Sequence, residues 1–169
     1  MLSLTKKRNN LLMWSHYAAA HRGFVIGFDS NDSFFHKEKP RTITPISEVK
    51  YSNKRPVLPA FEECAPENVH EIVFLTKSEH WSYEEELRMF AQPQAADAVR
   101  KAADGLDIYL FNFPPECLRE IIFGCQMSAT NKEEIAAAAK NRYSRVELYE
   151  ARLNETDFEL DVVPYQSRR

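Results

Sequence analysis

Residues 11–28, LLMWSHYAAAHRGFVIGF, join a helical pattern to a strand pattern around Gly23. Asn10 is a suitable helix N-cap, and Gly23 supplies the stop for a helix expected over residues 11–21. The apolar run over residues 24–28 is rich in β-forming residues and apolar on both faces, so it predicts an interior strand. This segment indicates a fold that combines helices with a sheet.

The flanking segments continue this alternation in both directions. Strands are expected over residues 2–5, 41–51, 106–113, 121–125, 145–153 and 158–163, and helices over residues 66–78 and 128–143. The first of these helices should have Val69, Val73 and Phe74 inside. Residues 29–32 should form a turn or the start of a short helix ending near His36. Residues 92–104 should form a surface helix or a loop insertion, and residues 114–116 one helical turn. The closing hairpin over residues 145–163 should be peripheral.

We therefore expect a single α+β domain over residues 1–169. Its sheet should be mixed and largely antiparallel, with about six or seven strands and about three or four packed helices.

The composition is that of a soluble globular protein. The 169 residues are 44% hydrophobic and 28% charged with a formal net charge of −3, so no global basic field indicates a nucleic-acid partner. No transmembrane or signal-peptide pattern is present, and we expect no membrane partner. The three cysteines form no CxxC pair, which favours reduced thiols in a cytoplasmic protein. The four glycines form neither a dinucleotide fingerprint nor a P-loop, although NAD bound by another fold stays open.

Aromatic and imidazole side chains gather on the first helix and at its end. Trp14 and Tyr17 are three residues apart and share a helix face, and His16 lies beside that face. His16 is either a hydrogen-bonded structural histidine or part of a site. His16 and His21 are five residues apart, which does not chelate a metal from a regular helix, so no metal site is predicted.

A second group, HWSYEEELR from His80 onwards, contains three consecutive carboxylates. As a strand it puts Glu84, Glu86 and Arg88 on one face, whereas as a helix it groups its aromatic and leucine side chains. One interpretation is a solvated acidic stretch closed by an ion pair with Arg88. The other is a Glu-x-Glu pair directed into a cleft and flanked by aromatic rings. In that case repulsion and burial should raise one carboxyl pKa towards working pH.

Four motifs follow one another along the chain. They are LMWSHYA from Leu12, HxGFVIGFD from His21, Lys77 with Trp81-x-Tyr83-Glu84-x-Glu86-x-Arg88, and Pro115 with Ile121-Ile122-Phe123-Gly124. This combination resembles the bacterial family catalogued as domain of unknown function 2971, from residue 2 to about residue 164. Members usually begin with a Tyr-Lys-Tyr-Arg-like strand and later carry an Asn-Asp-Pro-Phe-like motif. Neither is present, so we expect the chain to correspond to about the C-terminal two-thirds of a longer domain. The family name implies no activity.

The Glu-x-Glu segment is followed by a proline-initiated turn at residues 113–116 and by the apolar run 121–123. This order is similar to the later half of the ADP-ribosyltransferase superfamily. The resemblance implies NAD, with Glu86 holding the nicotinamide-ribose hydroxyl and stabilising an oxocarbenium-like transition state, and Glu84 orienting the acceptor. It also implies that Tyr17 or Trp81 stacks on nicotinamide. The first-strand His or Arg of those enzymes has no counterpart here.

We therefore predict one site in which the early helix and the acidic segment face each other across an open cleft. Its catalytic residues would be Glu86, Glu84 and His16, and its ligand-binding residues Tyr17, His21, Trp81, Tyr83 and Arg88. The leading function is NAD-dependent ADP-ribosyl transfer in phage defence or a toxin system.

Two alternatives stay open. In the first, the chain is a non-catalytic interaction module in which Arg88 neutralises Glu84 or Glu86. In the second, it binds or processes a nucleotide or nucleic acid. That role requires the basic clusters at residues 6–8, 37–41 and 50–55 to converge on one face.

Overall fold

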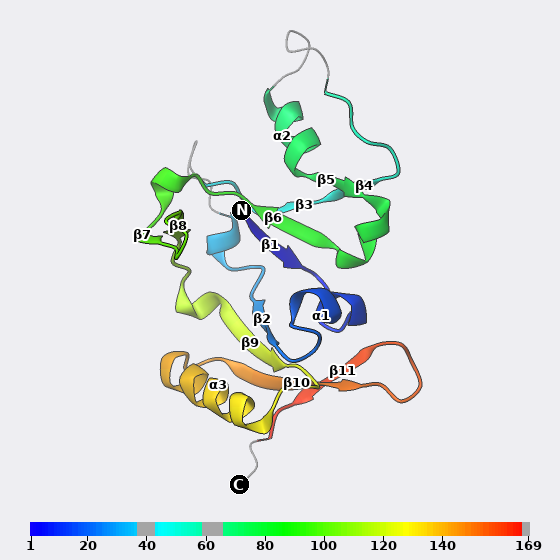
Figure 1. Ribbon diagram of the computed structural model, residues 1–169, viewed down its shortest axis with the longest axis vertical. Helices are drawn as coiled ribbons and strands as arrows, with labels where there is room; N and C mark the ends of the chain where they lie inside the picture. The colour runs from blue at the N-terminus through cyan, green and yellow to red at the C-terminus, as the bar shows by residue number, and fades with distance from the viewer. Residues whose placement is uncertain (37–42, 59–65, 167–169) are drawn as a thin grey trace. The chain divides into compact units, whose positions relative to one another are not determined.

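The computed structural model describes residues 1–36, 43–58 and 66–166 (Figure 1). The chain divides into two compact units, and each is described by itself. Unit 1 comprises Met1–Lys6 and Phe35–Asn112, and unit 2 comprises Lys7–Phe34 and Phe113–Arg169. The short 3₁₀ helix η1 (Ser33–His36) spans the boundary and confirms the predicted helix ending at His36.

Unit 1 is built from short strands and turns. Its elements are β1 (Leu2–Thr5), β3 (Ser47–Glu48), β4 (Lys50–Ser52), α2 (Pro66–Phe74), β5 (Thr76–Ser78), the 3₁₀ helix η2 (Glu79–Glu84), β6 (Glu86–Met89), the 3₁₀ helix η3 (Pro93–Ala95), β7 (Ala98–Lys101) and β8 (Asp107–Leu110). The strands form an antiparallel sheet in the order β1-β6-β3, a parallel pair β4-β5 and an antiparallel pair β7-β8. The β1–β6 register pairs Thr5 with Glu86, so Glu86 is the residue at which the acidic segment joins the sheet.

Unit 2 contains one larger sheet with a helix packed on it. Its elements are α1 (Leu11–Tyr17), β2 (Phe24–Phe28), the 3₁₀ helix η4 (Pro115–Cys117), β9 (Leu118–Phe123), α3 (Ala129–Arg142), β10 (Glu147–Leu153) and β11 (Leu160–Pro164). The strand order is β11-β10-β9-β2, with β9 and β10 parallel and the other pairs antiparallel. Ser128 caps α3 by accepting a hydrogen bond from the backbone N–H of Asn131.

The α+β class and the largely antiparallel pairing are confirmed. The strands of the described residues are divided among several small sheets, however, rather than gathered into one sheet of six or seven. None of the helices in the described part of the chain has the length and apolar character that a membrane crossing requires. Cys117 and Cys125 are free thiols, and Cys64 lies outside the described residues.

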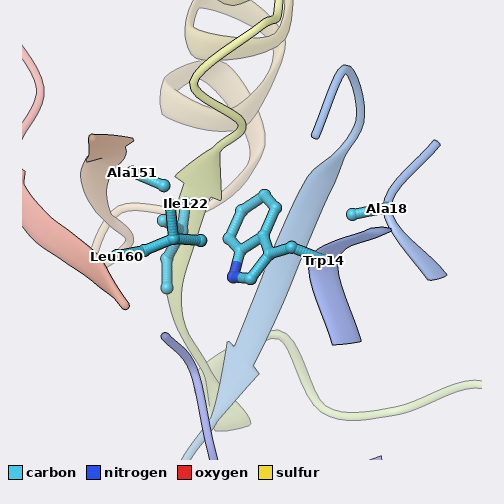
Figure 2. Close-up of a cluster of buried hydrophobic side chains, with 5 residues drawn as sticks. All are labelled: Trp14, Ala18, Ile122, Ala151 and Leu160. Carbon is cyan, nitrogen blue, oxygen red and sulfur yellow. The ribbon is translucent and has the colours of Figure 1, made fainter. Parts of the chain in front are cut away.

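The core of unit 2 forms around the indole of Trp14. Figure 2 shows this ring pointing from α1 towards Ile122 of β9 and Leu160 of β11. Ala151 of β10 and Leu160 are both almost fully buried. The prediction of a peripheral closing hairpin was therefore wrong, because β10 and β11 continue the sheet and supply part of its core.

The helix of the opening segment is shorter than predicted. It ends at Tyr17, where the backbone N–H of Ala18 donates to the carbonyl of Trp14, rather than near residue 21. The strand that follows forms where expected, but it lies at the end of the sheet order rather than inside it. Phe24 and Ile26, which share one face of this strand, are exposed.

Two segments of unit 1 also differ from their predictions. The helix from Pro66 stops at Phe74, and residues 76–78 form β5. Val73 and Phe74, which were expected inside, are exposed to solvent. Residues 92–104, predicted as a surface helix or a loop insertion, instead hold η3 and the first strand of the β7–β8 hairpin. Residues 41–42 of the strand predicted from 41 to 51 lie outside the described residues.

Candidate functional site

The acidic segment changes conformation between its carboxylates. Glu84 is the last residue of η2, Glu85 adopts a left-handed φ of 43°, and Glu86 is the first residue of β6. The left-handed residue turns the chain from a 3₁₀ helix into a strand. Glu84 and Glu86 thereby reach the same cation although they belong to different elements.

Four charged side chains of unit 1 form one network, which we call the charge cluster: Lys77, Glu84, Glu86 and Arg88. Lys77 Nζ donates hydrogen bonds to Oε2 of Glu84 and, at 3.0 Å, to Oε2 of Glu86. Arg88 donates to both carboxylate oxygens of Glu86, from Nε at 2.8 Å and from Nη2 at 3.0 Å. Its Nη1 also donates to the carbonyl of Phe74. The cluster holds two positive and two negative charges that compensate one another.

The carboxylates are the buried members of the charge cluster. Glu84 is 2% exposed and Glu86 is 7% exposed. Burial raises the pKa of Glu86, but hydrogen bonds from Arg88, Lys77 and Ser3 outweigh it and lower that pKa to about 2. Burial acts to lower the pKa of Lys77, but the hydrogen bonds that Lys77 donates to the two glutamates outweigh burial, so this pKa is raised. The expectation that repulsion raises a carboxyl pKa is wrong for Glu86, because two cations lie against it.

The backbone of the acidic segment is fixed as firmly as its side chains. Thr5 Oγ1 donates to the carbonyl of Glu84, and the N–H of Glu86 donates to the hydroxyl of Tyr51 at 2.8 Å. The N–H of Val49 donates to the carbonyl of Glu86 at 3.0 Å. Contacts from two separate stretches of unit 1, residue 5 and residues 49–51, therefore meet at this turn.

Aromatic side chains lie at the exposed side of the charge cluster. Lys77 Nζ is 5.1 Å from the ring centre of Trp81, a distance typical of a cation–π contact. The rings of Trp81 and Tyr83 are 6.0 Å apart, and Trp81 is partly exposed. Lys77 belongs to a quoted motif, but no role was predicted for it. Three adjacent carboxylates need a cation besides Arg88, and that requirement is the sequence signal that could have identified it.

The residues predicted from the early helix belong to unit 2. His16 and Tyr17 are exposed neighbours whose rings meet edge to face at 6.1 Å. His21 instead stacks on Trp14, and its Nε2 lies 3.0 Å from Oγ of Ser15. The structure therefore brings Trp81, Tyr83, Glu84, Glu86 and Arg88 together in unit 1, and His21 to Ser15 in unit 2. That the two groups form one site stays a prediction.

The basic clusters are partly neutralised in the described residues. Lys6 pairs with Glu48 and Lys50 with Glu71 in unit 1, and Arg8 pairs with Glu120 at 2.8 Å in unit 2. The cluster at residues 37–41 lies outside the described residues. Within the described ranges, no group of three or more His, Cys, Asp or Glu side chains could hold a metal ion.

Comparison with known proteins adds a family similarity without an activity. No curated protein and no solved structure matches the chain. One family model matches a segment of the chain that includes Trp81 and the whole charge cluster and ends just after Arg88. This segment is shorter than the resemblance expected from residue 2 to about residue 164. Residues 13–89 match the model of a family described as a protein of unknown function, DUF2971.

Proposed function

We propose that unit 1 is a protein-interaction module whose charge cluster holds the fold together. The observation that carries this proposal is that both carboxylate oxygens of Glu86 already accept hydrogen bonds from Lys77 or Arg88. The Glu86 side chain is also nearly buried. A carboxylate that stabilises an oxocarbenium ion has to touch the sugar. Here a substrate would first have to displace two partly buried cations from a buried carboxylate, which is costly.

The surface that fits an interaction role is the β7–β8 hairpin (Figure 1). All eight residues of its two strands are exposed, on both faces. Four of them are large and apolar: Val99, Ile108, Tyr109 and Leu110. A two-stranded hairpin is only marginally stable alone. An apolar hairpin gains stability when further strands pair with it or another surface covers it.

The partner that we propose for this hairpin is a second copy of the chain, joined through β8. Self-pairing of β7 would bring Arg100 and Lys101 of both copies together, and like charges on adjacent strands repel. Strand β8 carries one charge, Asp107, beside three apolar residues. Antiparallel pairing of β8 with its copy gives a closed two-fold dimer, whereas β7-to-β8 pairing would leave open edges that propagate.

Replacing Ile108 with lysine should weaken the dimer about tenfold or more, because each copy loses an apolar side chain that the dimer would bury and gains a positive charge on the pairing strand. Sedimentation velocity over a concentration series measures this. Val57→Lys is the matched control, since Val57 is an exposed apolar residue of unit 1 outside the hairpin.

Three results would contradict this assignment. The wild-type protein could be monomeric at about 100 μM, where a micromolar dimer is visible. The Val57 variant could dissociate as fully as the Ile108 variant. Open-ended polymers in place of dimers would contradict pairing through β8.

A second candidate is ADP-ribosyl transfer from NAD in the bacterial cytoplasm, in phage defence or a toxin system, as the superfamily resemblance implies. Two features favour it. With a pKa of about 2, Glu86 is ionised at neutral pH, as a group that stabilises positive charge must be. Trp81, partly exposed above Lys77, offers a flat ring on which nicotinamide can stack.

NAD turnover separates the two candidates. If unit 1 is an interaction module, the wild-type protein should not consume NAD in a chromatographic assay of nicotinamide release. If it is a transferase, the wild type should consume NAD, and Glu86→Gln should lower turnover by about 100-fold or more while circular dichroism shows a folded protein. Turnover by the wild type would overturn the assignment of the charge cluster to structure alone.

A further inference from the structure

We infer that Ser15 and His21 of unit 2 form a nucleophile–base pair able to take the acyl group of an activated ester. This inference concerns unit 2 and does not rest on the role proposed for unit 1. Ser15 Oγ and His21 Nε2 lie 3.0 Å apart, within the range in which an imidazole activates a serine hydroxyl.

An unusual turn brings the imidazole back to the helix. Ala19, Ala20 and His21 follow α1 with positive φ values of 49°, 51° and 65°. Such conformations are uncommon for residues other than glycine, and the surrounding structure must compensate for their strain. The His21 N–H donates to the carbonyl of Trp14, and the imidazole stacks on the Trp14 indole at an interplanar angle of 10°.

The backbone of His21 is fixed from its other side by the loop after β9. The N–H of Gln126 donates to the His21 carbonyl at 3.0 Å. Gly124 packs so closely that a Cβ there would lie 2.0 Å from the same carbonyl oxygen. Ring and backbone are thus both held, which is the preorganisation that a catalytic base requires.

The two ring nitrogens of His21 differ in their surroundings. Nε2 faces Ser15, whereas Nδ1 is buried and has no hydrogen-bond partner among the described residues. A neutral imidazole carries its proton on one nitrogen. With the proton on Nδ1, Nε2 accepts the hydrogen bond from the Ser15 hydroxyl, which is the arrangement needed for proton transfer.

Ser15 is exposed and can be reached from solvent. Leu12, three residues earlier on the same helix face, is 51% exposed and offers an apolar surface beside it. A small hydroxyl beside an apolar patch fits an ester with a short apolar acyl group. In the first step His21 Nε2 takes the hydroxyl proton as the Ser15 Oγ–acyl bond forms. The ester C–O bond then breaks, its electrons go to the leaving oxygen, and His21 gives the proton to that oxygen so that the alcohol departs. Water then hydrolyses the acyl-serine and releases the carboxylic acid.

A fluorophosphonate tests the pair, because Ser15 Oγ bonds to phosphorus, fluoride leaves, and His21 takes the proton. Incubation of the full chain should give one added phosphonyl group by intact mass, mapped to Ser15 by peptide sequencing. His21→Asn should slow labelling by about 100-fold or more. Asparagine tolerates a left-handed φ, so this variant retains the turn. The same substitution at His36, an exposed histidine of η1, should leave the labelling rate unchanged.

Ser15→Ala supplies a second test that does not depend on the strained turn, since alanine suits a helix. The wild type should hydrolyse p-nitrophenyl butyrate, and this variant should not. The inference is overturned if the wild type is not labelled, if label maps to another serine, or if His21→Asn, shown folded by circular dichroism, is labelled at the wild-type rate. If His21→Asn does not fold, two results still decide the inference: whether the wild type is labelled at Ser15, and whether Ser15→Ala loses the ester hydrolysis of the wild type. These outcomes leave the dimer assay of unit 1 unaffected.

Discussion

Replacing Lys77 with methionine should lower the free energy of unfolding by about 3 to 5 kcal/mol, the range for breaking a buried ion pair on one side. Lys77 is the only member of the charge cluster that contacts both Glu84 and Glu86. Without it the charge cluster keeps one cation, Arg88, for two buried carboxylates. Urea denaturation followed by tryptophan fluorescence and circular dichroism measures the loss.

Two companion variants separate this effect from a general cost of removing a lysine. Adding Glu84→Gln to the Lys77 variant should recover about half of the loss or more, because the excess charge disappears. Lys50→Met should cost less than about 1 kcal/mol, since Lys50 and its partner Glu71 are largely exposed. Equal losses for the Lys50 and Lys77 variants would show that the cluster does not stabilise unit 1.

Segments with a strong local signal were predictable from the sequence. The helix near residues 128–143 has a capping serine and a polar face, and it forms as α3 within one residue at each end. The last two strands pair as a hairpin, as their spacing indicates. The parallel pairing of β10 with β9 was not predictable, because it depends on packing between residues about 27 positions apart. That missing pairing is why the hairpin was expected at the periphery.

The acidic segment shows a different limit of sequence reading. Its pattern fits both a helix and a strand, and the structure uses each for part of it. The switch depends on the left-handed Glu85, and a glutamate gives no sequence signal for that conformation. The Glu86–Arg88 pair was visible from its spacing of two. Lys77 comes from β5, so the sign of the Glu86 pKa change could not be worked out without the fold.

The Ser15–His21 pair was hidden by the predicted length of the first helix. In a regular helix continuing to residue 21, side chains six positions apart would point about 120° apart and lie about 9 Å apart along the axis. Because α1 ends at Tyr17 and the chain turns back through left-handed residues, the two side chains meet. The contact depends on this turn, and the alanines at positions 19 and 20 give no sequence signal for its left-handed conformation.

Acidification should remove about 3 kcal/mol of the free energy of unfolding through Glu86 alone. Its pKa is lowered from 4.5 to about 2 in the folded protein, where hydrogen bonds from Arg88, Lys77 and Ser3 outweigh the opposing effect of burial. A lowered folded-state pKa means that the contribution is fully present above pH 4.5 and is lost as the pH falls towards 2. Urea titrations at a series of pH values measure this slope.

Glu86→Gln isolates the residue, because glutamine keeps the size of the side chain and does not titrate. The variant should be less stable than the wild type by a constant amount at neutral pH. That difference should shrink as the pH falls below about 4.5 and should be about 3 kcal/mol smaller near pH 2. Other carboxylates titrate in both proteins, so subtracting the two curves removes them. A difference that stays constant from pH 7 to pH 2 would mean that Glu86 does not lie between its two cations in solution, and the structural role of the charge cluster would fall with it.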